Sequence, residues 1–233
     1  MIPKKIHYCW FGNGAKGELI ETCIASWRKI LPDYEIIEWN ESNFDWNKYE
    51  YSRNVYNQKK WAFVADYARL IILREHGGIY LDTDMFVLRP FDEFLNNELV
   101  LGKEDETHIS AGMIACVPGN VFIDKCLEYY NLNTKELITI PRILTKIYGD
   151  NINILNNVKV FEWKYFYPYT ADNIKKFNYS NAPTESYAVH MWNYSWGHPA
   201  VKLIKKIGIH KIIVKTLDKL KIKNFIKKLL GTA

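Results

Sequence analysis

The sequence has few of the features that mark secreted or membrane-spanning proteins. Its four cysteines (Cys9, Cys23, Cys116 and Cys126) form no CxxC pair and have no metal-finger spacing. We therefore expect free, mostly buried thiols in a reducing compartment. The apolar run at the N-terminus is too short for a signal peptide, and no run of about 18 uncharged apolar residues predicts a membrane span. These absences predict a cytoplasmic protein.

Internal repeats and low-complexity linkers are also absent before about residue 200. With 48% hydrophobic and 24% charged residues, the composition excludes a disordered chain and predicts a folded globular protein. We expect one domain over residues 1–200 and a separate basic tail over residues 201–233.

The tail differs from the rest of the chain in charge. Residues 201–233 contain ten lysines and one acid, a charge of +9 in a chain of net charge +5, which leaves −4 for the first 200 residues. Apolar residues alternate with these lysines in a pattern typical of an amphipathic helix, which suits an anionic membrane surface. A merely solvated helical face is the alternative. Nucleic acid is disfavoured because the tail has no arginine and the body has no recognition motif.

Hydrophobic spacing predicts an α/β domain. A strand over residues 6–11, a helix over 18–31 and a strand over 34–39 are typical of a crossover unit in a parallel sheet. Residues 61–76 are apolar almost all round, which predicts a buried helix, whereas residues 40–60 show no clear period. Further strands are predicted over 79–87 (with a possible break), 99–102, 111–117, 158–161 and 187–191, and further helices over 120–130 and 141–148.

The sharpest local motif is the GGIYLDTD run at residues 77–84. Positions two apart in an extended segment point to the same side, so Asp82 and Asp84 would present two carboxylates together. Such a pair repels itself and is costly to desolvate unless a divalent cation lies between the two groups. Oxygen ligands of this kind suit Mg²⁺ or Mn²⁺. A solvated β-turn that caps its own backbone is the alternative.

A second motif precedes it on the apolar helix. Asp66 and Arg69 are three residues apart and therefore share one face of that helix. Burying either charge alone is expensive, so they must pair with each other or with a polar ligand. The pair is either a structural salt bridge or a set of hydrogen-bonding groups for a polyhydroxylated ligand near the cation.

Together these motifs resemble the family 32 glycosyltransferases, a group with a DXD sugar-binding region. The resemblance covers IPKKIHYCWFG at residues 2–12 and the block at 61–90, which includes Asp66, Arg69 and the DXD pair. The group is related to initiating mannosyltransferases, α-1,4-galactosyltransferases and the glucosylating domains of clostridial toxins. The resemblance implies a GT-A (Rossmann-like) fold, a nucleotide-diphosphate sugar donor, a divalent metal and retention of anomeric configuration.

The resemblance also implies roles for residues of both matching segments. Trp10 would stack on the donor base, Asp66 and Arg69 would contact donor sugar hydroxyls, and Tyr80 would lie nearby. Asp82 would reach the ribose or sugar and the metal, and Asp84 would ligate the metal directly. The residues by themselves support the carboxylates, whereas an aromatic such as Trp10 in a first strand is more often part of the core.

A late run, HMWNYSWGH at residues 190–198, resembles the loop with which related enzymes close the donor site. It implies that His190 is the third metal ligand, with Ser195 and Trp196 near the diphosphate; His198 is a weaker alternative ligand. His190 could instead be structural or face the acceptor. Residues 110–113 (SAGM) either pack as a loop or line the acceptor side.

We therefore predict a metal-dependent retaining transferase. It would move a hexose from a nucleotide-diphosphate sugar to a glycan or lipid-linked oligosaccharide, in bacterial surface polysaccharide or lipo-oligosaccharide synthesis. The favoured donor is a UDP-sugar (galactose, glucose or N-acetylhexosamine), and GDP-mannose is the alternative. A magnesium-dependent aspartyl-nucleophile phosphatase is the alternative enzyme class, although its downstream motifs are missing here. A catalytically idle sugar-nucleotide or membrane-binding module is the other alternative.

The basic tail gives a first testable prediction. If it holds the protein on the inner face of the plasma membrane, deletion of residues 201–233 should abolish sedimentation with anionic liposomes, because each basic residue near such a surface contributes about 1 kcal/mol. Neutral liposomes provide the control. Equal sedimentation of the full and truncated chains would contradict the prediction.

Overall fold

The computed structural model describes residues 1–193, so the predicted tail over 201–233 lies outside the described residues. The chain begins with β1 (Lys5–Cys9), α1 (Glu18–Ile30) and β2 (Glu35–Trp39). β1 and β2 pair in parallel. This confirms the crossover unit that the sequence predicts at the start of the chain.

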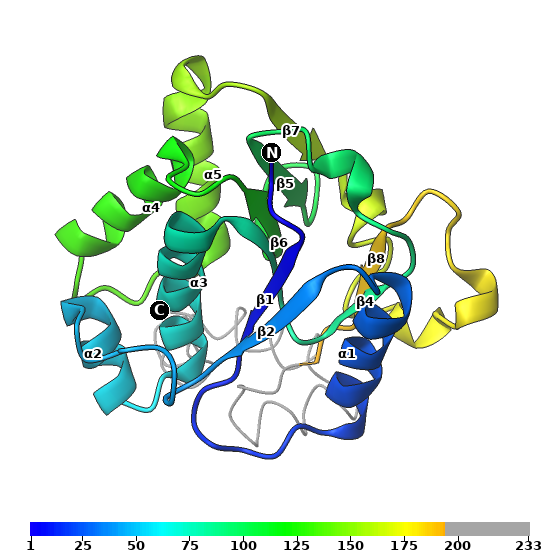
Figure 1. The fold of residues 1–233 in the computed structure, drawn as a ribbon, viewed down its shortest axis with the longest axis horizontal. Helices are drawn as coiled ribbons and strands as arrows, with labels where there is room; N and C mark the ends of the chain where they lie inside the picture. The colour runs from blue at the N-terminus through cyan, green and yellow to red at the C-terminus, as the bar shows by residue number, and fades with distance from the viewer. Residues whose placement is uncertain (194–233) are drawn as a thin grey trace, which may run out of the picture.

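The central sheet has six strands in the order β2-β1-β3-β6-β5-β7 (Figure 1). The remaining strands of this sheet are β3 (Gly78–Leu81), β5 (Leu99–Lys103), β6 (Ile109–Cys116) and β7 (Val158–Phe161). Only β6 runs against its two neighbours, while the other neighbouring pairs are parallel. The prediction of a mostly parallel sheet is therefore confirmed.

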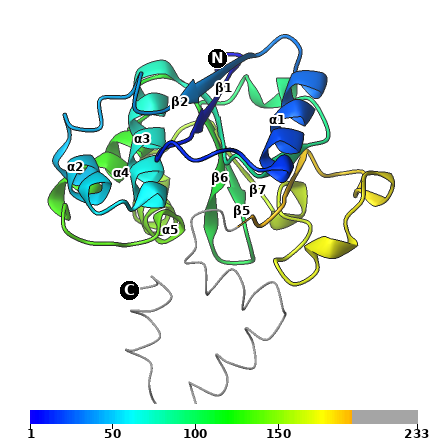
Figure 2. The ribbon, with the colours of Figure 1, turned by 90° about the horizontal axis from the view of Figure 1, so that it is seen from below.

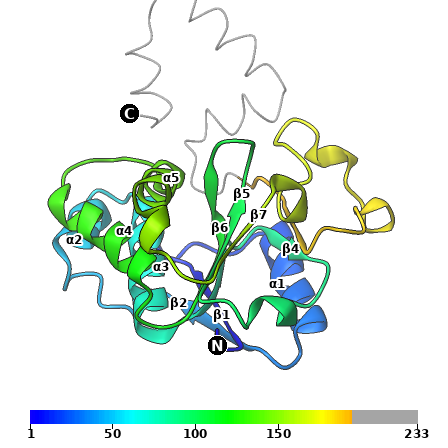
Figure 3. The same ribbon diagram turned by 90° about the horizontal axis from the view of Figure 1, so that it is seen from above.

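Helices cover both faces of the sheet. Figure 3 shows α2 (Glu50–Asn57), α3 (Trp61–His76), α4 (Val121–Leu132) and α5 (Ile140–Asn151) on one face and α1 on the other. Of these, α2 lies in the stretch for which the sequence predicted no element. Its amphipathic turns are short and begin within a polar, aromatic segment, so no period is visible there. Among residues 1–193, the structure contains no helix with the length and apolarity that a membrane crossing requires.

The face that α1 covers also carries a small second sheet. Its two antiparallel strands are β4 (Met85–Val87) and β8 (Ala188–His190). The segment that follows β7 folds back on this side of the sheet (Figure 2). Single 3₁₀ turns occur at Asp92–Phe94, Ile152–Ile154, Trp163–Tyr165, Ile174–Lys176 and Tyr179–Asn181.

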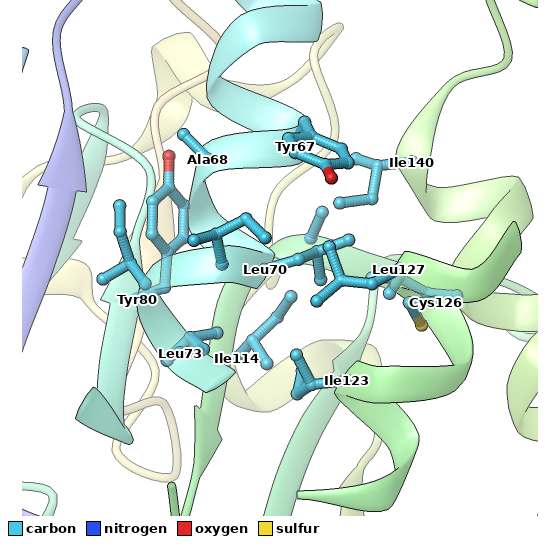
Figure 4. Close-up of a cluster of buried hydrophobic side chains, with 14 of the residues drawn as sticks. Tyr67, Ala68, Leu70, Leu73, Tyr80, Ile114, Ile123, Cys126, Leu127 and Ile140 are labelled. Atoms are coloured by element: carbon cyan, nitrogen blue, oxygen red, sulfur yellow. The ribbon is translucent and has the colours of Figure 1, made fainter. Parts of the chain in front are cut away.

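Two apolar cores fix the sheet between these layers. On the side of α2–α5, α3 packs between the sheet and α4, with Leu70, Leu73, Ile114 and Leu127 fully enclosed (Figure 4). On the α1 side, Trp27 and aromatic residues near β4 and β8 form the second core. All four cysteines are buried free thiols, as predicted.

A pair of glycines joins the buried helix α3 to β3. Gly77 has φ +61°, and a Cβ there would lie 2.6 Å from Pro118 Cδ and 2.9 Å from the Cys116 carbonyl oxygen. Only glycine combines that backbone conformation with so little space. The turn therefore aims β3, and the acidic pair that follows it, alongside β1.

The same turn is tied to β1 by a buried histidine. His7 is fully buried; its Nε2 donates to the Gly77 carbonyl (3.0 Å), and its Nδ1 accepts from Trp39 Nε1 (3.1 Å). A carbonyl only accepts and an indole N–H only donates, so both ring nitrogens are satisfied in the neutral form alone. Burial, with His76 nearby, lowers the pKa of His7 to about 4.

This histidine predicts an acid sensitivity of the fold. Because its pKa falls from 6.5 unfolded to about 4 folded, the unfolded chain binds more protons in that window, and stability falls as pH drops from 6.5 to 4. The contribution is on the order of 3 kcal/mol. Denaturant unfolding at pH 7 and pH 4.5 should show a smaller acid loss for His7→Gln, which cannot titrate, than for the wild-type chain. The same acid loss in both proteins would contradict this.

Candidate active site

The acidic pair lies at one edge of the central sheet. Asp82, Thr83 and Asp84 form a break between β3 and β4, so the possible break in the predicted strand is real. The Asp82 N–H donates to the Gly112 carbonyl (2.8 Å), and the Met85 N–H donates to the Asp82 carbonyl (3.0 Å). Strands β1, β2 and β3 are parallel, and this is the edge at which their carboxyl ends meet. Ligands bind α/β sheets at such edges.

The buried guanidinium of Arg69 connects α3 to this edge. It lies 2.8 Å from Asp66 Oδ1 and 3.2 Å from Asp82 Oδ1. It also donates to the Ala111 carbonyl on β6 (2.8 Å). The predicted Asp66–Arg69 pair therefore forms, and it extends to the first aspartate of the DXD motif.

Tyr80 completes this group from within β3. The Arg69 guanidinium lies over the Tyr80 ring, with Arg69 Cζ 4.3 Å from the ring centroid. The Tyr80 hydroxyl donates to Asp82 Oδ1 (3.3 Å). The structure thus brings together four residues that the sequence predicted to act on the donor: Asp66, Arg69, Tyr80 and Asp82.

Burial and charge act against each other in this group. Burial alone would lower the pKa of Arg69, but Asp82, Tyr80 and Asp66 outweigh it and raise that pKa, so the guanidinium stays charged. Burial raises the pKa of Asp66, and Arg69 opposes the rise. Burial, together with Asp84, also raises the pKa of Asp82. The carboxylates are therefore held in a site where negative charge needs a cationic partner.

A late strand brings a histidine to the second aspartate. β8 pairs with β4 so that His190 lies opposite Met85. Asp82, Asp84 and His190 each offer one ligand atom, and these three atoms lie within 4.8 Å of one another. His190 Nε2 is 3.2 Å from Asp84 Oδ1. The three residues that the resemblance implied as metal ligands are thus brought together from two separate regions of the chain.

Asp84 and His190 affect each other's pKa. Burial works to raise the pKa of Asp84, but His190 and the Asn193 N–H lower it on balance. Burial works to lower the pKa of His190, but Asp84 and Asp82 raise it. The Asp84 carboxylate and the His190 imidazole thus shift each other's pKa in opposite directions, because each favours the charged form of the other.

The cluster fits a divalent cation in its chemistry. Two carboxylates and one imidazole are suitable ligands for such an ion. His190 Nδ1 is buried without a hydrogen-bond partner in the described part of the chain. A buried polar atom of this kind calls for a ligand or a second arrangement of the ring.

Trp10 lies just beyond the end of β1. Its backbone N–H donates to the Trp39 carbonyl (2.8 Å), its indole N–H donates to the Gly14 carbonyl (2.6 Å), and Lys16 Nζ lies 5.6 Å from the ring. It packs only partly against the core on the α1 side. Its stacking on a base stays a prediction. Ser195, Trp196 and His198 lie outside the described residues.

Two further residues shape the site: the sequence analysis named Gly112 only within residues 110–113, and it did not identify Tyr167. Residues 110–113 belong to β6, which confirms the strand predicted over 111–117 and corrects the interpretation of residues 110–113 as a loop. A Cβ on Gly112 would lie 2.8 Å from the Tyr167 hydroxyl and 3.2 Å from Asp82 Oδ2. Tyr167 lies in an irregular stretch after β7, where no periodic signal marks it.

Comparison with a family model gives an independent result. The model described as "Glycosyltransferase sugar-binding region containing DXD motif" matches residues 17–101. That range contains the pair on α3 and the DXD motif. Among the alternatives that the sequence left open, this match favours the transferase over the phosphatase and the idle module.

Individual proteins agree with this match. The chain is 28% identical to an uncharacterized glycosyltransferase of Acanthamoeba polyphaga mimivirus over 92% of this chain and 91% of the relative. It is 26% identical to the human alpha-1,4-N-acetylglucosaminyltransferase over 72% of this chain, but spans only 50% of that relative. The PaToxG glycosyltransferase superposes with a TM-score of 0.53 at 20% identity, over 65% of this chain and 70% of the other. The predicted GT-A fold is confirmed.

The close approach at Gly112 leads to a prediction. We expect Gly112→Ala to fold but to lose about 10- to 100-fold in donor turnover, because the new methyl group displaces Asp82 or Tyr167 and small misplacements near a reacting group are costly. Donor hydrolysis with Mn²⁺ measures this. Gly149→Ala, where a Cβ meets nothing within 4 Å, is the matched control. Equal turnover of the two variants would count against the assigned geometry.

Proposed function

The chain belongs to the glycosyltransferases whose sugar-binding region contains a DXD motif, and on that premise we propose that it is a metal-dependent, retaining hexosyltransferase. Its donor would be a nucleotide-diphosphate sugar and its acceptor a hydroxyl of a glycan or lipid-linked oligosaccharide. One observation carries this proposal: Asp82 faces Arg69 on one side and joins Asp84 and His190 on the other. The Asp82 carboxylate thus connects the Asp66–Arg69 pair, which would bind sugar hydroxyls, to the proposed cation site.

Asp82, Asp84 and His190 would hold a divalent cation, Mn²⁺ or Mg²⁺. When bound, such an ion stabilises the negative charge that gathers on a leaving diphosphate. His190 ligates a metal only through an unprotonated ring nitrogen. Because the pKa of His190 is raised, protonation of that nitrogen competes with metal binding. The Asn193 N–H keeps Asp84 oriented through its hydrogen bond to Oδ2 (2.7 Å).

Asp66 and Arg69 would orient the sugar. Arg69 is fixed by Asp66, Asp82 and the Ala111 carbonyl, so its guanidinium cannot swing away when the sugar enters. A carboxylate and a guanidinium offer the acceptors and donors that sugar hydroxyls require. Trp10 would position the base at the end of β1, and Tyr80 would keep Asp82 in place. Ser195 and Trp196 would contact the diphosphate.

The donor that we propose is a UDP-sugar carrying galactose, glucose or an N-acetylhexosamine. The human relative is named an alpha-1,4-N-acetylglucosaminyltransferase, which supports the last of these. For the biological role we propose bacterial surface polysaccharide or lipo-oligosaccharide synthesis at the cytoplasmic side of the membrane. The basic tail over residues 201–233 supports that location through its charge.

The experiment uses a panel of nucleotide sugars with Mn²⁺ and measures release of free sugar or transfer to added glycans. We expect Asp84→Asn to reduce turnover by more than about 100-fold, because residues that only support a metal ligand already account for 10- to 100-fold. Removal of metal with a chelator should have the same effect on the wild-type chain, and added Mn²⁺ should reverse it. The fold should remain, which circular dichroism would check.

The control is Asp150→Asn, which removes an exposed carboxylate at the end of α5. It should keep wild-type turnover. Full activity of Asp84→Asn, or turnover that a chelator leaves unchanged, would overturn the proposal. Cleavage of phosphomonoesters in place of nucleotide sugars would favour the phosphatase alternative.

A further inference from the structure

Trp192 has an unusual backbone conformation directly beside the cation site. Its φ is +53°, and within residues 1–193 the other non-glycine residues with positive φ are two asparagines and a lysine. Asparagine adopts this left-handed conformation readily, whereas a bulky side chain rarely does. Such outliers persist when surrounding contacts hold them, and they gather at functional sites.

The left-handed conformation of Trp192 sets the direction of two backbone N–H groups after β8. The Met191 N–H donates to the Asp84 backbone carbonyl (2.9 Å). Two residues later the Asn193 N–H donates to Asp84 Oδ2 (2.7 Å). Trp192 lies between these two donors, so its conformation turns both N–H groups toward the same aspartate.

The indole side chain holds the other member of the cluster. Its ring meets the His190 imidazole at a centroid distance of 4.4 Å and an interplanar angle of 81°. Its Nε1–H donates to the Tyr169 carbonyl (2.8 Å), which fixes the ring from the far side. Tyr167 packs against His190 from another direction, with ring centroids 5.5 Å apart. The Tyr167 and Trp192 rings also contact each other, with centroids 6.3 Å apart, so two adjoining aromatic rings pack against the imidazole.

We propose that Trp192 is the positioning residue of the cation site. Its backbone orients the Asp84 carboxylate through Asn193, and its indole fixes the plane of the His190 ring. The side chain of Trp192 contacts His190, Tyr167 and Tyr169, and we assign it a role that acts through the two ligands. The inference rests on the proposed function for the identity of the site, and its test separates the two.

The experiment measures binding of Mn²⁺ alone, without donor, by calorimetry on the full chain. Trp192→Val removes the indole and places a β-branched residue where φ is positive, so both effects are lost. We expect its dissociation constant for Mn²⁺ to rise about 10- to 100-fold, the usual cost of losing a group that supports a metal ligand. Trp192→Phe keeps a ring against His190 and should recover most of the affinity.

The control is Trp163→Val, which removes a 41% exposed tryptophan from the 3₁₀ turn Trp163–Tyr165. It should bind Mn²⁺ as the wild-type chain does. Thermal melting without metal shows which variants fold. If Trp192→Val does not fold, the Mn²⁺ affinity of Trp192→Phe decides whether Trp192 positions the cation site.

The outcomes distinguish this inference from the proposed function. If Asp84→Asn loses Mn²⁺ binding while both Trp192 variants bind like the wild type, the role of Trp192 is wrong and the cation site stands. If Trp163→Val weakens binding as much as Trp192→Val, the effect is general and the inference also fails. If the wild-type chain binds no Mn²⁺, both proposals fail.

Discussion

The site depends on one buried cation, the guanidinium of Arg69. Its side chain is 5% exposed, in the middle of a helix whose other buried residues are apolar except Asp66 and the hydroxyl of Tyr67. A charge so deeply buried is tolerated only where oppositely charged and hydrogen-bonding groups surround it. Asp66, Asp82 and the Ala111 carbonyl provide those groups from α3, the DXD turn and β6. The position of the first DXD carboxylate is therefore coupled to the core of the domain.

A second constraint acts from the opposite side. β4 is held to α1 by two hydrogen bonds, from Trp27 Nε1 to the Met85 carbonyl (2.6 Å) and from the Val87 N–H to Ser26 Oγ (2.9 Å). β8 then pairs with β4 and brings His190 to Asp84. The two aspartates of the DXD motif thus belong to different environments: one faces a fixed guanidinium, the other an imidazole that can lose its proton. This division suits one carboxylate to the sugar and both to a cation.

Apolar and polar residues occupy different parts of the central sheet. Apolar packing on both faces fixes the strands, and the polar residues gather where the parallel strands end. Side chains placed there keep access to a ligand while their backbones remain part of the sheet. The glycines at positions 77 and 112 serve this arrangement directly, because each lets one strand approach another group more closely than a Cβ would allow.

Many features of the fold and of the candidate site were predictable from local sequence patterns. The strand–helix–strand start, the buried helix, the break at Asp82–Asp84 and the Asp66–Arg69 pair were all predictable, since each depends on the spacing of residues within one segment. The site residues Asp82, Asp84 and His190 were also predicted, the last through a family resemblance rather than from its own spacing. The short helix α2 was missed, because its eight residues carry too few apolar positions to show a period.

Only the tertiary structure decided which distant groups meet. The contact of Arg69 with Asp82, the neutral state of His7, the space at Gly112 and the turn at Trp192 all join segments far apart in the chain. No local periodicity encodes such contacts, because they arise from the register of β1 with β2 and β3, of β3 with β6 and of β4 with β8, and from the packing of α3 on the sheet. The sequence by itself determined the chemistry that the chain carries, and the packing of its strands determined where that chemistry is assembled.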